Sequence, residues 1–237
     1  MFTGLVQSVG RVAGVARKGT RVRLSVDPGE WEHVPAAGDS ISVSGCCLTV
    51  ANVSKGRKRV LEFDVVAESL DKTRLGALRV GDGVNLEHAA TPTTLMGGHL
   101  VQGHVDGVGR VARVKEGDDW RVWVALPAGK GRDEDLAEYL VPKGSVCVDG
   151  VSLTVAGLWS GKVGGVGDKK DRGFSVALIP TTLEGTTLKG LKVGDPVNLE
   201  MDLIAKTVVQ WVKKFGGVSG GNGGLRRQVR RGSRKGR

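Results

Sequence analysis

The chain has 237 residues, of which 40% are hydrophobic and 25% are charged, a composition that excludes wholesale disorder. Its 38 glycines follow no G-x-y period, which excludes collagen, and no apolar run reaches the roughly 18 residues that a membrane-spanning helix needs. The net charge of +10 is concentrated at the end of the chain, because residues 216–237 hold seven bases and no acid, which leaves only +3 for residues 1–215.

The basic segment 216–237 consists mostly of glycine, serine and arginine and cannot form a core, so we predict a disordered tail. Two interpretations are open: a contact with nucleic acid or a membrane surface, or a solvated tail without a function. The second is favoured, because no aromatic residue is interleaved with the arginines to stack on bases. We therefore expect no membrane partner and no nucleic-acid partner.

The cysteines and histidines indicate neither a disulfide framework nor a metal centre. Cys46, Cys47 and Cys147 are an odd number with an adjacent pair, which is typical of a reducing, cytoplasmic environment. The four histidines lack the spacing of zinc ligands. The first residues also lack the basic and apolar regions of a secretory signal. We expect a cytoplasmic protein that holds no metal.

The sequence contains an internal repeat. Four blocks recur in the same order, at spacings of 99, 105, 113 and 113 residues. The matched blocks are 9–13 with 108–112, 45–50 with 150–155, 69–73 with 182–186, and 80–87 with 193–200. A period of about 100 residues is the size of a small domain rather than of a solenoid repeat. We predict two homologous domains over 1–97 and 98–202.

Short strands are predicted in both halves. Apolar and polar residues alternate in several segments, as expected for strands with one buried face. These segments are 22–26, 40–44, 121–124 and 145–149. Such short strands, separated by glycines, are typical of a small closed barrel or a sandwich. The polar segment 161–173 is predicted to be a mobile loop between two strands.

Helices are predicted at a few places only. Short helices are expected at 68–75, at the matching 182–188, and at 133–140, where Pro142 follows. A longer helix is predicted at 203–215, with Asp202 as a possible N-cap. One stripe of this helix is apolar, formed by Ile204, Val208, Trp211, Val212 and Phe215. Two hypotheses are open for the stripe: it meets the same helix of other subunits, or it docks on its own barrel.

Two pairs of small polar residues occupy equivalent strands. Cys47 and Thr49 are two positions apart, so both point to one face of the strand, and Ser152 and Thr154 repeat the arrangement. Two similar polar pockets would suit a reaction between two identical substrates held face to face. The alternative is that these are ordinary strand hydroxyls and a buried thiol.

Five segments together resemble riboflavin synthase: the start MFTGLV, the strand pair at 38–50, the run MGGHLVQGHVDG at 96–107, and residues 143–155 and 197–202. The resemblance extends to about residue 212. It implies an all-β fold of two six-stranded Greek-key β-barrels with short helices, and a homotrimer joined by C-terminal helices. It also names lumazine synthase as a candidate partner.

The implied reaction is the last step of riboflavin biosynthesis and needs no cofactor. Two molecules of 6,7-dimethyl-8-ribityllumazine exchange a four-carbon unit and give riboflavin and 5-amino-6-(D-ribitylamino)uracil. The enzyme would therefore be a transferase. The family also includes lumazine-carrying proteins that bind one chromophore and do no chemistry, and these are the main alternative. A nucleic-acid-binding function would depend on the tail alone.

The resemblance also implies two sets of substrate contacts. One ring would meet Gly4, Leu5, Val6, Cys47, Leu48, Thr49 and a strand formed by Asp64, Val65, Val66, Ala67, Glu68 and Ser69. The other ring would meet Gly103, His104, Val105, Ser152, Leu153, Thr154 and a strand formed by Ala177, Leu178, Ile179, Pro180, Thr181 and Thr182. Ser40 would add to the binding sites. In a trimer, the second pocket would face the first pocket of a neighbouring subunit.

Roles in the reaction are less specific. A proton must leave a 7-methyl group and a nucleophile must reach ring carbon 7; the candidates are Cys47, His104, Ser152 and water. His104 is a possible base for Ser152, since an imidazole exchanges protons near neutral pH. Lys143 would neutralise charge on a substrate, or is simply exposed. Asp202 would accept a hydrogen bond from the substrate, or only caps the helix. No role is expected for His33, His88 or His99.

The sequence departs from the family at several places. Ser44 stands where the family usually has asparagine, and TPTT at 91–94 replaces a more charged linker. The loop at 161–173 is longer than usual, and the arginine tail is additional. None of these departures removes a candidate catalytic residue.

Overall fold

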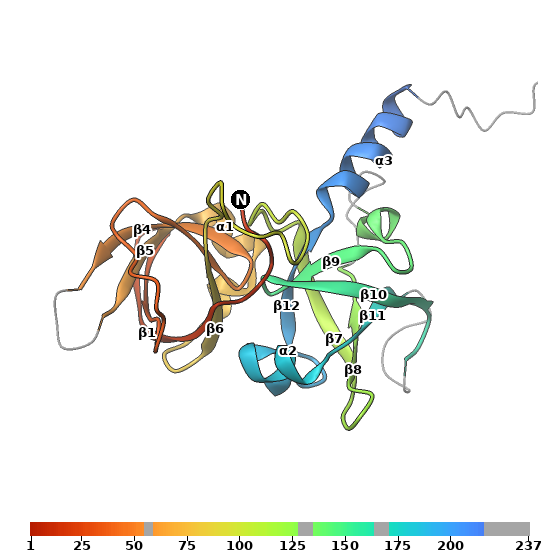
Figure 1. Ribbon diagram of the computed structural model, residues 1–237, viewed down its shortest axis with the longest axis horizontal. Helices are drawn as coiled ribbons and strands as arrows, with labels where there is room; N and C mark the ends of the chain where they lie inside the picture. The colour runs from red at the N-terminus through yellow and green to blue at the C-terminus, as the bar shows by residue number, and fades with distance from the viewer. Residues whose placement is uncertain (55–58, 128–134, 164–170, 216–237) are drawn as a thin grey trace, which may run out of the picture.

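The computed structural model describes residues 1–54, 59–127, 135–163 and 171–215. These residues form two closed six-stranded barrels side by side, followed by a helix (Figure 1). The predicted tail at 216–237 lies outside the described residues, as do 164–170 of the predicted loop at 161–173 and the start of the helix predicted at 133–140. Within the described part, no helix is long and apolar enough to cross a membrane.

The first barrel has the spatial order β1-β2-β5-β4-β3-β6, and β6 closes it by pairing with β1. Its strands are β1 (Ser8–Lys18), β2 (Arg21–Asp27), β3 (Ser40–Val43), β4 (Cys46–Val53), β5 (Leu61–Val65) and β6 (Gly83–His88). All of its strand pairs are antiparallel, in a Greek-key order.

The second barrel repeats this arrangement with the order β10-β11-β8-β7-β12-β9. Its strands are β7 (Gly107–Lys115), β8 (Arg121–Ala125), β9 (Ser145–Val148), β10 (Val151–Ser160), β11 (Arg172–Ala177) and β12 (Pro196–Met201). The all-β fold of two homologous barrels, predicted from the repeat and the resemblance, is confirmed.

The alternating pattern of the strands explains both cores. In β2, Val22, Leu24 and Val26 are buried, while the residues between them are only partly covered. Phe63 in the first barrel and Phe174 in the second are fully buried at equivalent places. Each barrel thus has its own core, as a small domain requires.

The short helices begin earlier than predicted and are broken in two. The elements are α1 (Ala67–Lys72) with the 3₁₀ turn η1 (Arg74–Ala77), and α2 (Pro180–Gly185) with η4 (Thr187–Gly190). Thr73 and Thr186 interrupt them with an extended backbone, and their hydroxyls cap the turns that follow. The helix predicted at 133–140 is, in its described part, one 3₁₀ turn, η3 (Leu136–Tyr139).

Two strands were predicted to be too long, because more than half of each predicted range is not a strand in the structure. The strands expected at 64–69 and 177–182 end at Val65 and Ala177, and helices follow at once. Pro180 at the start of α2 explains the second break, because its fixed φ suits the first turn of a helix and it has no N–H for a strand ladder.

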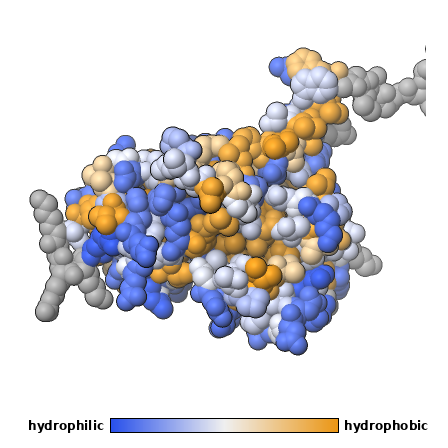
Figure 2. Space-filling model, viewed as in Figure 1, coloured by the Kyte–Doolittle hydropathy of each residue, from blue (hydrophilic) through white to orange (hydrophobic). Residues whose placement is uncertain are grey.

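The terminal helix α3 (Leu203–Phe215) projects beyond the second barrel (Figure 1). Its N-cap is Asp202, whose Oδ1 accepts from the N–H of Ala205 at 2.9 Å, so the predicted cap is confirmed. Ala205 and Val209 pack against the second core. The predicted stripe faces outward instead, with Trp211 60% exposed, and Figure 2 shows apolar surface along the helix. The hypothesis that the stripe docks on its own barrel is wrong.

Candidate active site

Two lead-in segments, residues 2–6 and 101–105, meet between the barrels. Phe2 and Val101 form an antiparallel bridge, with N–H to O distances of 2.7 and 3.1 Å. Both side chains are fully buried in a small cluster with Cys147. Each lead-in segment precedes its own barrel in sequence, and this bridge holds the two together.

A buried glutamate fixes each lead-in segment. Glu87 on β6 accepts from the N–H and hydroxyl of Thr3, at 2.6 and 2.8 Å, and from the N–H of Gly4 at 3.0 Å. Glu200 on β12 accepts from three successive N–H groups, at residues 102–104, over 2.6 to 3.0 Å. Burial raises the pKa of both carboxyls, and the N–H donors partly oppose it.

Each lead-in segment docks on the opposite barrel. The carbonyl of Gly4 accepts from the N–H of Ser152 at 2.7 Å, and the carbonyl of Gly103 accepts from the N–H of Cys47 at 2.8 Å. Val6 packs on the core of the second barrel, and Val105 on the core of the first.

The predicted grouping of contacts is therefore wrong in one respect. Gly4, Leu5 and Val6 belong with Ser152, whereas Gly103, His104 and Val105 belong with Cys47. The cause is the crossing of the two segments at the Phe2 and Val101 bridge.

Each lead-in segment lies so close to the strand of the opposite barrel that the contact requires glycine. Gly4 and Gly103 have φ values of 73° and 79°, in the left-handed region. A Cβ on Gly4 would lie 2.7 Å from the Cβ of Ser152, and a Cβ on Gly103 would lie 2.6 Å from the Cβ of Cys47. Both contacts are too short, so a side chain there would push the lead-in segment away from the strand.

The strands present their polar pairs outward, as predicted. On β4, Leu48 and Val50 are buried in the core, while Cys47 is half-buried and Thr49 is exposed. On β10, the equivalent Leu153 and Val155 are buried, Ser152 is half-buried and Thr154 is exposed. Both barrels thus carry a small polar pair beside a lead-in segment.

The thiols are poorly suited to ionise. Burial raises the pKa of Cys47, although the N-terminal ammonium and a hydrogen bond with Ser40 oppose this. Burial also raises the pKa of Cys46 to about 12 and that of Cys147 well above its usual range. Cys47 is therefore a neutral thiol near pH 7, which makes it a weak nucleophile.

Ser152 has a histidine partner that the sequence did not indicate. The Nδ1 of His99 lies 2.6 Å from the Ser152 hydroxyl oxygen. Burial lowers the pKa of His99, and the nearby Asp202 partly opposes this, so the ring is neutral at pH 7 and able to accept a proton. The two preceding glycines were the available signal, because a Cβ on Gly98 would lie 3.0 Å from the Ser152 oxygen.

The structure does not bring His104 to Ser152. His104 lies in the lead-in segment beside Cys47, with its N–H bound to Glu200 and its side chain exposed. Lys143 is exposed on a turn with φ 67°. Asp202 caps α3 and lies within electrostatic range of His99.

The segments after β5 and β11 divide into buried and exposed positions. The side chains of Val65 and Leu178 are buried in the cores, so these two residues could meet a ligand only through their backbone groups. Val66 and Ile179, at 49% and 61% exposure, present apolar side chains to solvent. Asp64 is bound to Arg23 at 2.7 and 2.9 Å. Among the residues described, no cluster of three or more His, Cys, Asp or Glu side chains has the arrangement of a metal site.

Comparison with known proteins gives matches over nearly the whole described chain. The lumazine binding domain matches twice, over residues 3–89 and 102–202. The riboflavin synthase of Mycobacterium tuberculosis (strain ATCC 25618 / H37Rv) is 41% identical over 217 residues, covering 91% of this chain and 100% of that protein. The riboflavin synthase of Escherichia coli (strain K12) is 35% identical, covering 90% and 92%.

Among solved structures, LumP complexed with 6,7-dimethyl-8-(1'-D-ribityl) lumazine has a similar fold. Its TM-score is 0.66 and its identity 24%, covering 85% of this chain and 99% of that one. LumP complexed with riboflavin gives a TM-score of 0.65 at 25% identity, covering 85% and 99%. With two lumazine binding domains and these relatives over about nine-tenths of its length, the chain belongs to the riboflavin synthase family.

Proposed function

We propose that this chain converts two molecules of 6,7-dimethyl-8-ribityllumazine into riboflavin and 5-amino-6-(D-ribitylamino)uracil, with one substrate in each barrel. The observation that carries the proposal is the pair of His99 and Ser152, 2.6 Å apart, beside a lead-in segment on the outer face of β10. A neutral imidazole held against a serine hydroxyl is the arrangement that general-base activation of a nucleophile uses.

The two sites have different tasks. In the second barrel, His99 accepts the hydroxyl proton of Ser152, and the Ser152 oxygen is directed at ring carbon 7 of the lumazine bound there. In the first barrel, Cys47 stays protonated because burial raises its pKa, and it forms a wall of the pocket. The lumazine of the first barrel would lose its 7-methyl proton to His104, the exposed imidazole beside Cys47.

The other predicted contacts keep supporting roles. Val66 and Ile179 would cover the flat faces of the two rings, since both are exposed apolar residues at equivalent positions. Ser40 would bind through its partner Cys47. Lys143 would reach a substrate of another subunit, because its side chain is exposed on a turn. Asp202 would act through its charge, which partly opposes the lowering of the pKa of His99.

A homotrimer joined through α3 is part of the proposal. The outward stripe of α3 supports it, with Trp211 and Val212 60% and 44% exposed. Replacing both with glutamate should disperse the oligomer in sedimentation and lower activity, because each pocket would lose its facing pocket. A fully active monomer would contradict the trimer. Lumazine synthase is a candidate partner, and three free thiols support a cytoplasmic location.

The alternative function is a lumazine carrier without catalysis, which the fold shared with LumP makes worth testing. The experiment is to incubate the purified chain with 6,7-dimethyl-8-ribityllumazine and no added cofactor. We expect riboflavin and the uracil product in equal amounts, one of each for every two substrates. Binding of one lumazine per chain without riboflavin formation would support the carrier instead.

A further inference from the structure

Two hairpin turns meet where the barrels join. Ser44 and Gly45 connect β3 to β4, and Asp149 and Gly150 connect β9 to β10. The φ values are 45° and 82° in the first turn and 46° and 81° in the second, as in a two-residue turn of type I′. A Cβ on Gly45 would lie 2.8 Å from the nitrogen of Gly150, so the two turns touch through their backbones.

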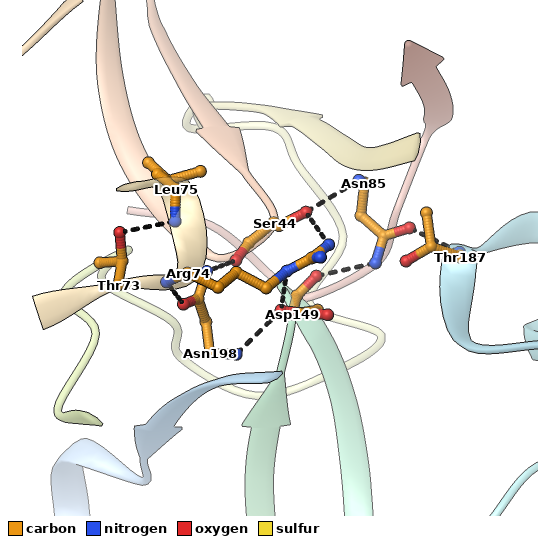
Figure 3. Close-up of polar contacts among 8 residues, drawn as sticks. All are labelled: Ser44, Thr73, Arg74, Leu75, Asn85, Asp149, Thr187 and Asn198. Atoms are coloured by element: carbon orange, nitrogen blue, oxygen red, sulfur yellow. Dashed lines mark hydrogen bonds and ion pairs between the residues drawn. The ribbon is translucent and has the colours of Figure 1, made fainter. Parts of the chain in front are cut away.

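Two asparagines link the turns symmetrically (Figure 3). The Nδ2 of Asn85, in the first barrel, donates to the carbonyl of Asp149 at 2.8 Å. The Nδ2 of Asn198, in the second barrel, donates to the carbonyl of Ser44 at 2.7 Å. Each asparagine Oδ1 accepts a backbone N–H from the opposite side, of Thr187 at 2.8 Å and of Arg74 at 2.7 Å.

Arg74 breaks this symmetry. Its Nε donates to Oδ1 of Asp149 at 2.9 Å, and its Nη2 donates to the hydroxyl of Ser44 at 3.1 Å (Figure 3). One guanidinium from the first barrel thus holds both turns. The equivalent residue of the second barrel is Thr187, whose hydroxyl is buried and has no hydrogen-bond partner among the described residues.

The Asp149 carboxylate depends on few donors. Its side chain is 1% exposed, and Oδ1 accepts from Arg74 and from the N–H of Asn198, while Oδ2 has no partner within the described chain. A buried ion pair contributes little net free energy to stability, because desolvation of the two charges offsets their attraction. The better-attested role of such a pair is to fix the relative positions of the segments that it joins. The arrangement here is that of the two turns.

The turn at Asp149 leads directly to the proposed catalytic serine. Ser152 lies three residues after Asp149 on β10, and its N–H is bound to Gly4 at 2.7 Å. A shift of this turn would therefore move Ser152 relative to both Gly4 and His99. The equivalent turn, at Ser44, leads in the same way to Cys47.

We propose that Arg74 is a positioning residue for the reaction: by clamping the turns at Ser44 and Asp149, it holds Ser152 in register with His99. The proposal rests on the proposed function of Ser152. Ser44 is part of the clamp, since its hydroxyl accepts the second guanidinium hydrogen bond.

The test is a double-mutant cycle between Arg74→Met and Ser152→Ala, with kcat and KM measured on 6,7-dimethyl-8-ribityllumazine. We expect Arg74→Met to lower kcat by about 10- to 100-fold with little change in KM, as a small misplacement of a catalytic group does. In the Ser152→Ala background the same substitution should have almost no further effect on kcat, because there is no hydroxyl left to position.

Arg74→Met leaves the buried carboxylate of Asp149 without its ion-pair partner, which could impair folding. A second variant therefore controls for misfolding. Arg74→Met with Asp149→Asn removes both charges and keeps an Asn-Gly turn. We expect it to fold with a melting temperature near that of the parent and still to have a low kcat. The matched control is Thr187→Val at the equivalent position, which removes an unpartnered hydroxyl and should leave kcat unchanged.

Two outcomes would overturn the clamp: a parental kcat in the charge-free double variant, or equal losses from Arg74→Met with and without the Ser152 hydroxyl. These are distinguishable from failure of the proposed function, which would appear as a fully active Ser152→Ala variant. A low kcat confined to backgrounds that contain Ser152 supports the clamp.

Discussion

The two barrels share one strand order, one pair of lead-in segments and one pair of buried glutamates, yet their outer faces differ in chemistry. The first barrel places Cys47 beside Gly103, and the second places Ser152 beside Gly4. Among the described residues, a hydrogen bond between an imidazole and the polar strand residue is found in the second barrel alone, because His99 lies in the connection between the barrels. The chain thus carries two copies of one domain, and these chemical differences are the basis of the separate tasks that we propose for them.

The largest expected effect tests the catalytic role that we propose for the second barrel. Ser152→Ala removes the hydroxyl that His99 binds and should lower kcat by about 100-fold or more, with little change in KM, since base-assisted steps contribute on the order of 100- to 10,000-fold. Steady-state assays of riboflavin formation measure it. A parental kcat would mean that the two barrels do not differ as we describe.

The repeat and the alternation predicted two β domains, because both patterns can be seen directly in the sequence, and the resemblance favoured closed barrels over sandwiches. On β4, apolar and polar residues alternate with a period of two: Leu48 and Val50 alternate with Cys47 and Thr49. The structure follows this pattern. The crossing of the lead-in segments was not predictable in this way. Residues near Gly4 and Gly103 precede their own barrels in sequence, and no periodicity states on which barrel a segment docks.

Two other features were missed for related reasons. Glu87 and Glu200 end matched apolar strands in both halves, and a buried acid at a repeated position was a usable signal for an anchored segment. For His99, the two glycines before it were the one available signal of a close contact, because the contact joins His99 to Ser152, 53 positions away in the sequence. Long-range contacts of this kind depend on the packing of the whole fold.

A second prediction tests the crossing itself. Gly4→Ala and Gly103→Ala each place a Cβ against the opposite strand, at a φ that costs alanine about 1–2 kcal/mol. We expect each variant to lose affinity at one site only, in the second barrel for Gly4→Ala and in the first for Gly103→Ala. Fluorescence titration with 6,7-dimethyl-8-ribityllumazine should show one of two sites weakened. Equal weakening of both sites would contradict the assignment.

The third prediction concerns pH. Burial lowers the pKa of His99 below the value of about 6.5 in an unfolded chain. As pH falls through 6.5, the unfolded chain takes up a proton that the folded chain does not, so the stabilising contribution of neutral His99 is present above 6.5 and is lost towards the lower folded pKa. A pKa difference of one between the two states corresponds to about 1.4 kcal/mol.

His99→Gln should therefore lose less stability than the parent between pH 7 and pH 5, because the difference between the two curves isolates this ring from the other histidines. Thermal melts across that interval measure it. The parent should also keep its kcat/KM below pH 6.5, since the acid limb follows the lowered pKa. Parallel melting curves for the two proteins would show that His99 titrates as a free histidine.

The smallest expected effect tests the first barrel. Cys47→Ser keeps the size of the side chain and a hydroxyl able to bond with Ser40, so the wall of the pocket should survive. Because burial keeps the native thiol protonated, no thiolate is lost, and we expect kcat and KM within about threefold of the parent. Cys47→Ala is the matched variant for the bond itself and should raise KM more than it lowers kcat. If Cys47→Ser were inactive while Ser152→Ala retained activity, the chemistry would belong to the first barrel, and the roles of the two halves would have to be exchanged.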